Sequence, residues 1–122
     1  MSRTFRATLP SICPSSNNAY YNLPRRGRTL TPEARAWKEA AMLIIRHAAA
    51  AAGFQAAPRT PLRLEIHLSL PAVRRSDASG RIKLLEDAVA AAIGIDDRYV
   101  DELFVTKRRG PEAVQIMVTA LE

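Results

Sequence analysis

Hydrophobic and polar residues alternate most strictly between Leu62 and Leu70, where every second side chain is a leucine or an isoleucine. A period of two is typical of a strand that buries one face. Shorter alternating stretches predict three more strands, at residues 4–9, 99–106 and 113–121. The segment 107–111, which separates the last two strands, is short enough for a hairpin.

Apolar residues at three- and four-residue spacing predict two helices. The first begins after Thr31, whose hydroxyl suits an N-terminal cap, and ends before Gly53. The second runs from a cap at Ser79 to Ile93, with Gly94 as its stop. The resulting order, β-α-β-α-β-β, predicts an α/β (α+β) fold in which a four-stranded mixed sheet carries two helices on one face.

Residues 11–30, between the first strand and the first helix, show no periodicity. They combine turn-forming proline, serine and asparagine with aromatic and basic side chains, so we predict a long ordered loop. Loops of this length inside small domains tend to be functional. A chain of 122 residues, 48% of them hydrophobic, suits one globular domain, which we expect to span residues 1–122.

The chain is basic, with 18 lysines and arginines against 12 acidic residues and a net charge of +6. This balance favours a polyanionic partner such as nucleic acid or an acidic surface. The excess of arginine over lysine suits phosphate contacts, although a high-GC coding bias produces the same composition.

Cys13 is the single cysteine, which excludes an intrachain disulfide and a thiolate metal cluster. The sequence contains no apolar run of membrane-spanning length, and its first residues lack the apolar core of a signal peptide. These features predict a cytoplasmic protein without a membrane partner.

Carboxylates and a lysine gather around the second predicted helix. Asp77 precedes this helix, Lys83 lies one turn inside it, and Asp96 and Asp97 follow its far end. A helix of this length is roughly 20 Å long, so spacing alone does not bring Asp97 to Asp77. Their approach requires either that the chain folds back along the sheet or that a second subunit contributes.

The same residues also allow a purely structural interpretation. Lys83 can pair with Asp87 at a spacing of four, Asp77 can cap the helix locally, and Asp96 and Asp97 can form a turn. Spacing by itself favours this interpretation.

Two basic clusters could contact phosphates, and tyrosines in the second could stack on exposed bases. The first comprises Arg74, Arg75 and Arg81; the second comprises Arg25, Arg26 and Arg28 together with Tyr20 and Tyr21. A solvated surface is the alternative, and the net charge favours phosphate contact.

Other common sites find no support in the sequence. His47 and His67 have no second histidine or cysteine at ligand spacing, so we assign both to structure and expect no zinc site. No serine is flanked by nucleophile-elbow glycines, and no glycine-rich loop could cradle phosphates.

Short motifs that are weak individually form a specific combination because they occur in a fixed order along nearly the whole chain. They are Leu9-Pro10, Ser16-Asn17-Asn18, Tyr20-Tyr21, Arg26-Gly27-Arg28-Thr29, the segment from Asp77 to Lys83, and Asp96-Asp97. In this combination the chain resembles the RusA family of Holliday-junction resolvases.

The resemblance implies a small homodimeric endonuclease that cuts four-way DNA junctions with the help of Mg²⁺. It implies that Asp77, Lys83 and Asp97 are catalytic, that Asp77 and Asp97 hold the metal, and that Ser79 and Asp96 are further candidate ligands. It also implies DNA contacts for the two basic clusters and their tyrosines, and for the neighbouring Asn17 and Asn18.

The chain departs from the family pattern at one place. Ser79 and Gly80 stand where the family carries a second aspartate and an asparagine. A serine hydroxyl can coordinate a cation but brings no charge. Whether Glu86, Asp87 or Asp96 replaces the missing acid is left open.

Three functions are therefore considered. The leading one is a junction-resolving endodeoxyribonuclease, and the second is a catalytically degenerate protein that binds branched DNA without cutting it. The third is an interaction module whose basic face meets a protein partner.

Overall fold

The computed structural model describes residues 2–14, 20–23, 27–75 and 79–121. Its centre is a four-stranded sheet in the order β1-β6-β4-β5. The strands are β1 (Thr4–Leu9), β4 (Leu62–Leu70), β5 (Val100–Arg109) and β6 (Ala113–Ala120). β4 is antiparallel to β6 and parallel to β5, so the sheet is mixed, as the sequence predicts.

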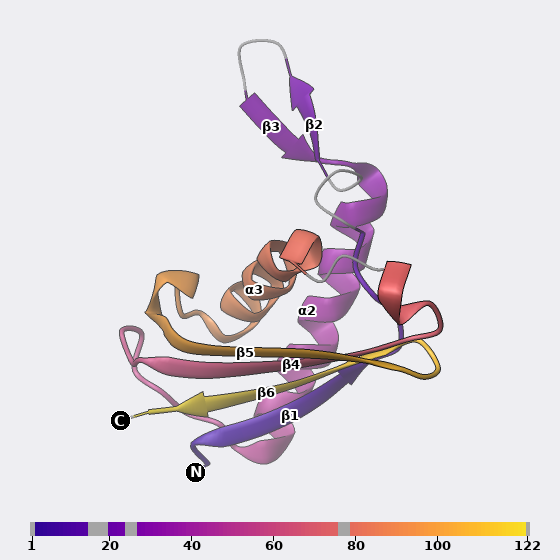
Figure 1. Cartoon of the computed structure of the whole chain (residues 1–122). Coiled ribbons are helices and arrows are strands. Elements are labelled where there is room, and N and C mark those ends of the chain that lie inside the picture. Colours follow the sequence, from indigo (N-terminus) through magenta and orange to yellow (C-terminus); the bar gives the residue numbers. More distant parts are fainter. Residues whose placement is uncertain (1, 15–19, 24–26, 76–78, 122) are drawn as a thin grey trace.

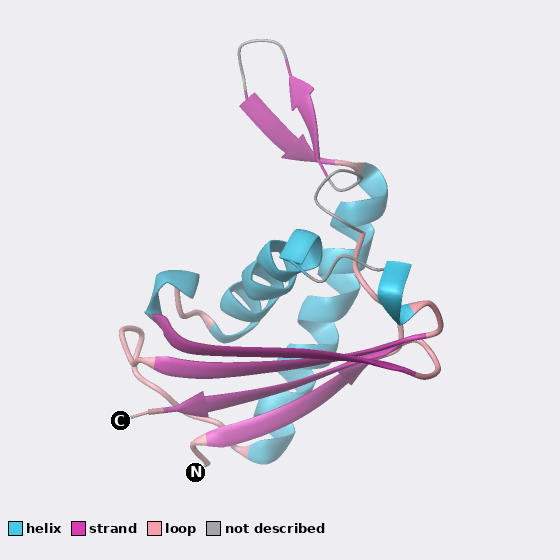
Figure 2. Cartoon of the chain, viewed as in Figure 1, coloured by secondary structure: helices cyan, strands magenta, loops and turns pink. Residues whose placement is uncertain are grey.

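The helices α2 (Pro32–Ala52) and α3 (Ser79–Ile93) pack on one face of this sheet (Figures 1 and 2). Every second residue of β4, beginning with Leu62, is buried beneath them, whereas the alternate residues are only partly buried. Side chains of α2, α3, β1 and β6 complete the same core. The predicted four-stranded mixed sheet with two helices on one face is confirmed.

The predicted cap of α2 and the predicted ends of both helices are confirmed. Thr31 caps α2, because its hydroxyl oxygen accepts a hydrogen bond from the amide of Ala34 at 3.2 Å. Gly53 and Gly94 follow the two helices with φ angles of 68° and 73°, in the left-handed region that glycine adopts at low cost. No helix in the described part of the chain is long and apolar enough to cross a membrane.

Residues 11–30 differ from the predicted loop. Two short strands, β2 (Tyr20–Leu23) and β3 (Gly27–Leu30), pair as an antiparallel hairpin. Figure 1 shows this hairpin projecting from the N-terminal end of α2, away from the four-stranded sheet. Strands of four residues are too short to display a clear alternation, which explains why the sequence pattern misses them.

The predicted hairpin between the last two strands is wrong. β4 lies between β5 and β6, and β5 continues to Arg109, so the basic residues 107–109 belong to a strand. The chain crosses the end of β4 at Gly110, whose amide donates to the carbonyl of Leu70 at 3.1 Å. A side chain at position 110 would bring its Cβ within 2.5 Å of Ser69 Oγ, which explains the glycine at this crossing.

Candidate active site

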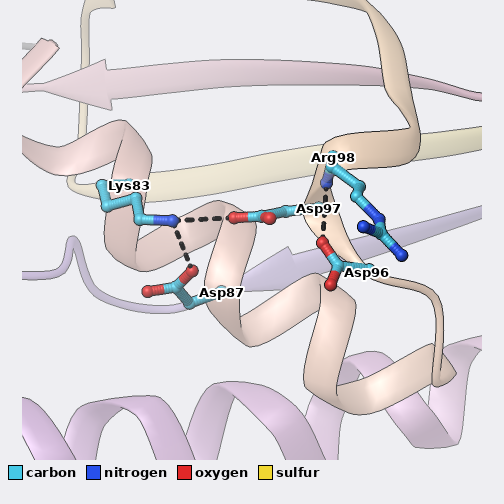
Figure 3. A network of polar contacts seen from close by, with 5 residues as sticks. All are labelled: Lys83, Asp87, Asp96, Asp97 and Arg98. Atoms are coloured by element: carbon cyan, nitrogen blue, oxygen red, sulfur yellow. Dashed lines mark hydrogen bonds and ion pairs between the residues drawn. The ribbon is translucent and has the colours of Figure 1, made fainter.

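Lys83 lies between two carboxylates. Its Nζ donates a hydrogen bond to Asp97 Oδ2 at 2.8 Å and lies 3.1 Å from Asp87 Oδ1 (Figure 3). Lys83 and Asp87 are one turn apart on α3, whereas Asp97 begins the short helix η2 (Asp97–Tyr99) beyond the end of α3. The structure therefore joins an acid and a base that are fourteen residues apart in the chain.

The turn after α3 brings Asp97 back to the helix. Gly94 ends α3 in the left-handed conformation, and Ile95 is buried in the core, where it anchors the turn. Asp96 then caps η2, because its carboxylate accepts a hydrogen bond from the amide of Arg98 at 2.9 Å. This turn returns the chain to α3 within one subunit, and the Lys83–Asp87 pair and the turn at Asp96 form as well. Asp77 lies outside the described residues, so its approach to Asp97 and its local cap stay predictions.

The charges of this cluster stabilise one another. The hydrogen bond to Asp97, followed by that to Asp87, raises the pKa of Lys83 above its ordinary value. The hydrogen bond from Lys83 lowers the pKa of Asp97. At neutral pH the site therefore presents an ammonium group held by two carboxylates, and the lysine side chain remains 63% exposed to solvent.

Glu86 lies on α3 near the same cluster, and the pKa of its carboxyl group shifts in the opposite direction to that of Asp97. Its partial burial raises the pKa of its carboxyl group, and the charge of Asp97 raises it further. The charge of Lys83 lowers the pKa of Glu86, but this effect is smaller than either of these two.

The donor chemistry fits a hard divalent cation, because Asp97 and Asp87 offer carboxylate oxygens. Within the described ranges, however, no group of three or more side chains of ligand type gathers closely enough to hold a metal ion. Asp77 lies outside the described residues, and for Ser79 only the position of the backbone at the start of α3 is described. A complete metal site would therefore need further ligands from residues beyond the described ones, or water.

The two histidines lie apart from this cluster. His47 is exposed on α2, and His67 on β4 contacts Thr106 on β5, with 2.6 Å between Nδ1 and Oγ1.

Arg81 holds the first turn of α3 against the segment that follows β1. Its Nη1 donates a hydrogen bond to the carbonyl of Cys13, and the Cys13 thiol donates to the carbonyl of Arg81 at 3.2 Å. The Nε atom of Arg81 is buried and has no hydrogen-bond partner among the described residues. Burial raises the pKa of the Cys13 thiol to about 11, so this cysteine stays protonated.

Among the other predicted DNA contacts, Arg74 is exposed in the short helix η1 (Val73–Arg75). Only backbone positions are described for Arg75 in η1, for Tyr20 and Tyr21 in β2, and for Arg28 in β3. The candidates that lie outside the described residues are Asn17, Asn18, Arg25 and Arg26.

The structure adds basic residues that were not among the predicted contacts. Lys107 and Arg108, at the end of β5, line an open hollow of about 410 Å³ together with Val73 and Arg74. The three consecutive basic residues 107–109 are visible in the sequence. The prediction places them in a hairpin loop, however, and therefore does not bring them beside Arg74.

Comparisons with known proteins add one informative match. The family model described as endodeoxyribonuclease RusA matches residues 11–119. No curated protein matches the chain. A solved structure of 2C-methyl-D-erythritol 2,4-cyclodiphosphate synthase from Plasmodium vivax aligns with 97% of this chain and 95% of its own, at 10% identity and a TM-score of 0.35. That likeness is too low to support an argument.

Proposed function

The chain belongs to the RusA family of endodeoxyribonucleases, and from this premise we propose that it resolves four-way DNA junctions by metal-assisted hydrolysis of phosphodiester bonds. The observation that carries the proposal is the 2.8 Å contact between Lys83 and Asp97. It joins, on one subunit, the residues that resemble the family's catalytic lysine and its later metal-binding acid.

In the proposed mechanism Asp97 and Asp77 hold Mg²⁺, with Ser79 and Asp96 as further candidate ligands. When bound, the ion polarises a phosphate oxygen and lowers the pKa of a water molecule. Lys83 stays protonated because its carboxylate partners raise its pKa, so its ammonium group can stabilise negative charge that develops on the phosphate. Asp87 helps to fix the position of that ammonium group.

The DNA backbone would follow the basic surface of the protein. Arg74 and Arg75 are proposed contacts, and Lys107 and Arg108 extend the basic surface beside Arg74. The hairpin segment would contribute a second group, comprising Asn17, Asn18, Tyr20, Tyr21, Arg25, Arg26 and Arg28. Arg81 is proposed to act chiefly by positioning α3, because its guanidinium group is bound to the Cys13 carbonyl.

The active form is proposed to be a cytoplasmic homodimer. A two-fold axis would relate two identical sites, which matches paired cuts in a junction that is itself nearly two-fold symmetric.

A second function has one observation in its favour. Ser79 brings no charge to a place where the family carries an acid, and a cation draws much of its affinity from the charge of its ligands. A protein that binds branched DNA without cutting it would be consistent with that substitution.

The variant Ser79→Asp separates these two functions. We expect it to raise the cleavage rate of a labelled four-way junction at limiting Mg²⁺ by on the order of tenfold, because a charged ligand strengthens metal binding. Ala91→Asp, which adds the same charge to an exposed position further along α3, is the matched control and should leave the rate unchanged.

The wild-type protein decides how this result is interpreted. Measurable cleavage by the wild type, increased by Ser79→Asp, supports the enzyme. Junction binding without any cleavage in the wild type, together with cleavage by Ser79→Asp, would contradict it and identify the natural chain as a degenerate binder.

A further inference from the structure

β5 is an exposed strand at the edge of the sheet. Within the described part of the chain it pairs with β4 alone, along nearly all of its ten residues. Three consecutive apolar side chains at its centre are exposed: Leu103 by 44%, Phe104 by 51% and Val105 by 36%. Natural proteins usually cover or interrupt an edge of this length and composition, because its free amide and carbonyl groups can pair with another strand.

The charges along β5 show which strand it would fit. Asp101 and Glu102 precede the apolar centre, and Lys107, Arg108 and Arg109 follow it. A copy of the same strand, running in the opposite direction, would present its basic end to this acidic end. Opposite charges across paired strands stabilise the pairing, and apolar pairs at the centre add to it.

Two-fold symmetry restricts how two copies of β5 can pair. A two-fold axis perpendicular to the sheet makes the two edge strands antiparallel and keeps residues of the same face opposite one another. With Phe104 on the axis, Asp101 lies opposite Lys107 of the partner subunit. With Val105 on the axis, Asp101 lies opposite Arg109 of the partner subunit. An acid therefore meets a base at both ends in either register.

We propose that β5 pairs antiparallel with β5 of a second copy of this chain, so that two four-stranded sheets become one continuous sheet. The inference rests on the proposed function in that it names the surface of the dimer that paired cutting requires. Because the axis keeps both helix layers on one side, both Lys83–Asp97 sites would face the same side of the joined sheet and could meet one DNA junction.

The other edge of the sheet does not offer this fit. β1 has six residues, and its apolar side chains Phe5, Ala7 and Leu9 are buried beneath the helices. Its central charge, Arg6, would approach a second Arg6 in an antiparallel pair. A DNA strand is also a poor occupant of the whole β5 edge, because Asp101 would repel its phosphates, whereas the charge of Glu102 is balanced by Arg63 at 2.8 Å.

Two complementary variants test the pairing. Asp101→Arg places a basic residue opposite Lys107 or Arg109 of the partner subunit, and the double substitution Lys107→Glu with Arg109→Glu places an acidic residue opposite Asp101, so each variant alone puts like charges opposite one another in either register. Light scattering after gel filtration, without DNA, should give twice the chain mass of 13.4 kDa for the wild type and 13.4 kDa for each variant alone. An equimolar mixture of the variants should recover the dimer mass. Arg6→Glu on β1 is the control and should remain dimeric.

Cross-linking supplies a second measurement that does not depend on charge reversal. Cys13 is fully buried, so an introduced cysteine would be the reactive one. Under mild oxidation Phe104→Cys or Val105→Cys should form a covalent dimer, according to which residue lies on the axis, whereas Thr8→Cys on β1 should not.

A monomeric wild type would overturn the inference. So would dimers that persist in both charge variants, variants that do not associate when mixed, or failure of both β5 cysteines to cross-link. These readouts involve no cleavage, so they are independent of the proposed function. A β5-linked dimer that neither binds nor cuts junctions would contradict the function and leave the pairing intact.

Discussion

Replacing Lys83 with alanine is expected to lower the cleavage rate of a four-way junction by at least about 100-fold, with little change in junction binding. The expected loss is large because the ammonium group, held by Asp97 and Asp87, is positioned before the substrate arrives. Such a preorganised charge stabilises the transition state more than it stabilises the bound substrate. Initial rates with saturating protein on a labelled junction measure the effect.

Lys38→Ala is the matched control, because it removes a lysine from α2, the other helix of the layer. It should cut at the wild-type rate. Equal losses in the two variants would mean that Lys83 contributes only general basic charge, and equal rates in Lys83→Ala and the wild type would remove it from the mechanism.

Asp97→Asn is expected to reduce cleavage to a similar extent, by about 100-fold or more. Asparagine preserves the size of the side chain but removes the negative charge that a hard cation prefers. The change also removes the main cause of the raised pKa of Lys83, so the pKa of that lysine should fall toward its ordinary value. Titration of the rate with Mg²⁺ should show that the variant needs more metal.

The control for this variant is Glu39→Gln, which neutralises an exposed acid on α2. Thermal unfolding should change little in Asp97→Asn, since the Lys83 side chain of the pair is 63% exposed and ion pairs that solvent reaches contribute little to stability. A loss of cleavage that is accompanied by loss of the folded state would argue against a direct role.

Local features of the sequence account for much of the fold. A hydroxyl at Thr31 and glycines at positions 53 and 94 define the helix ends, and strict alternation locates β4. The order of the strands depends on non-local pairing instead. Nothing in residues 107–111 distinguishes a hairpin from a crossing over the end of β4, which is why β5 and β6 were expected to be neighbours.

The candidate site likewise has parts that the sequence predicts and parts that depend on contacts between distant segments. The sequence identifies Lys83 and Asp97 through a family resemblance, but only the turn at Gly94 and Ile95 brings them together. The pairing of Lys83 with Asp87 follows from helical spacing and is confirmed. The engagement of Arg81 with Cys13 could not be predicted, because it depends on how the segment after β1 packs against α3.

The most direct test of the proposed function is to map the cuts that the wild-type protein makes in a four-way junction. Each of the four strands is labelled in turn, and the junction is incubated with protein in Mg²⁺ or in a chelator, beside a linear duplex of the same sequence. We predict Mg²⁺-dependent nicks at symmetric positions in two opposing strands, and none in the duplex. Junction binding without nicks at any Mg²⁺ concentration, or equal cutting of junction and duplex, would contradict the account.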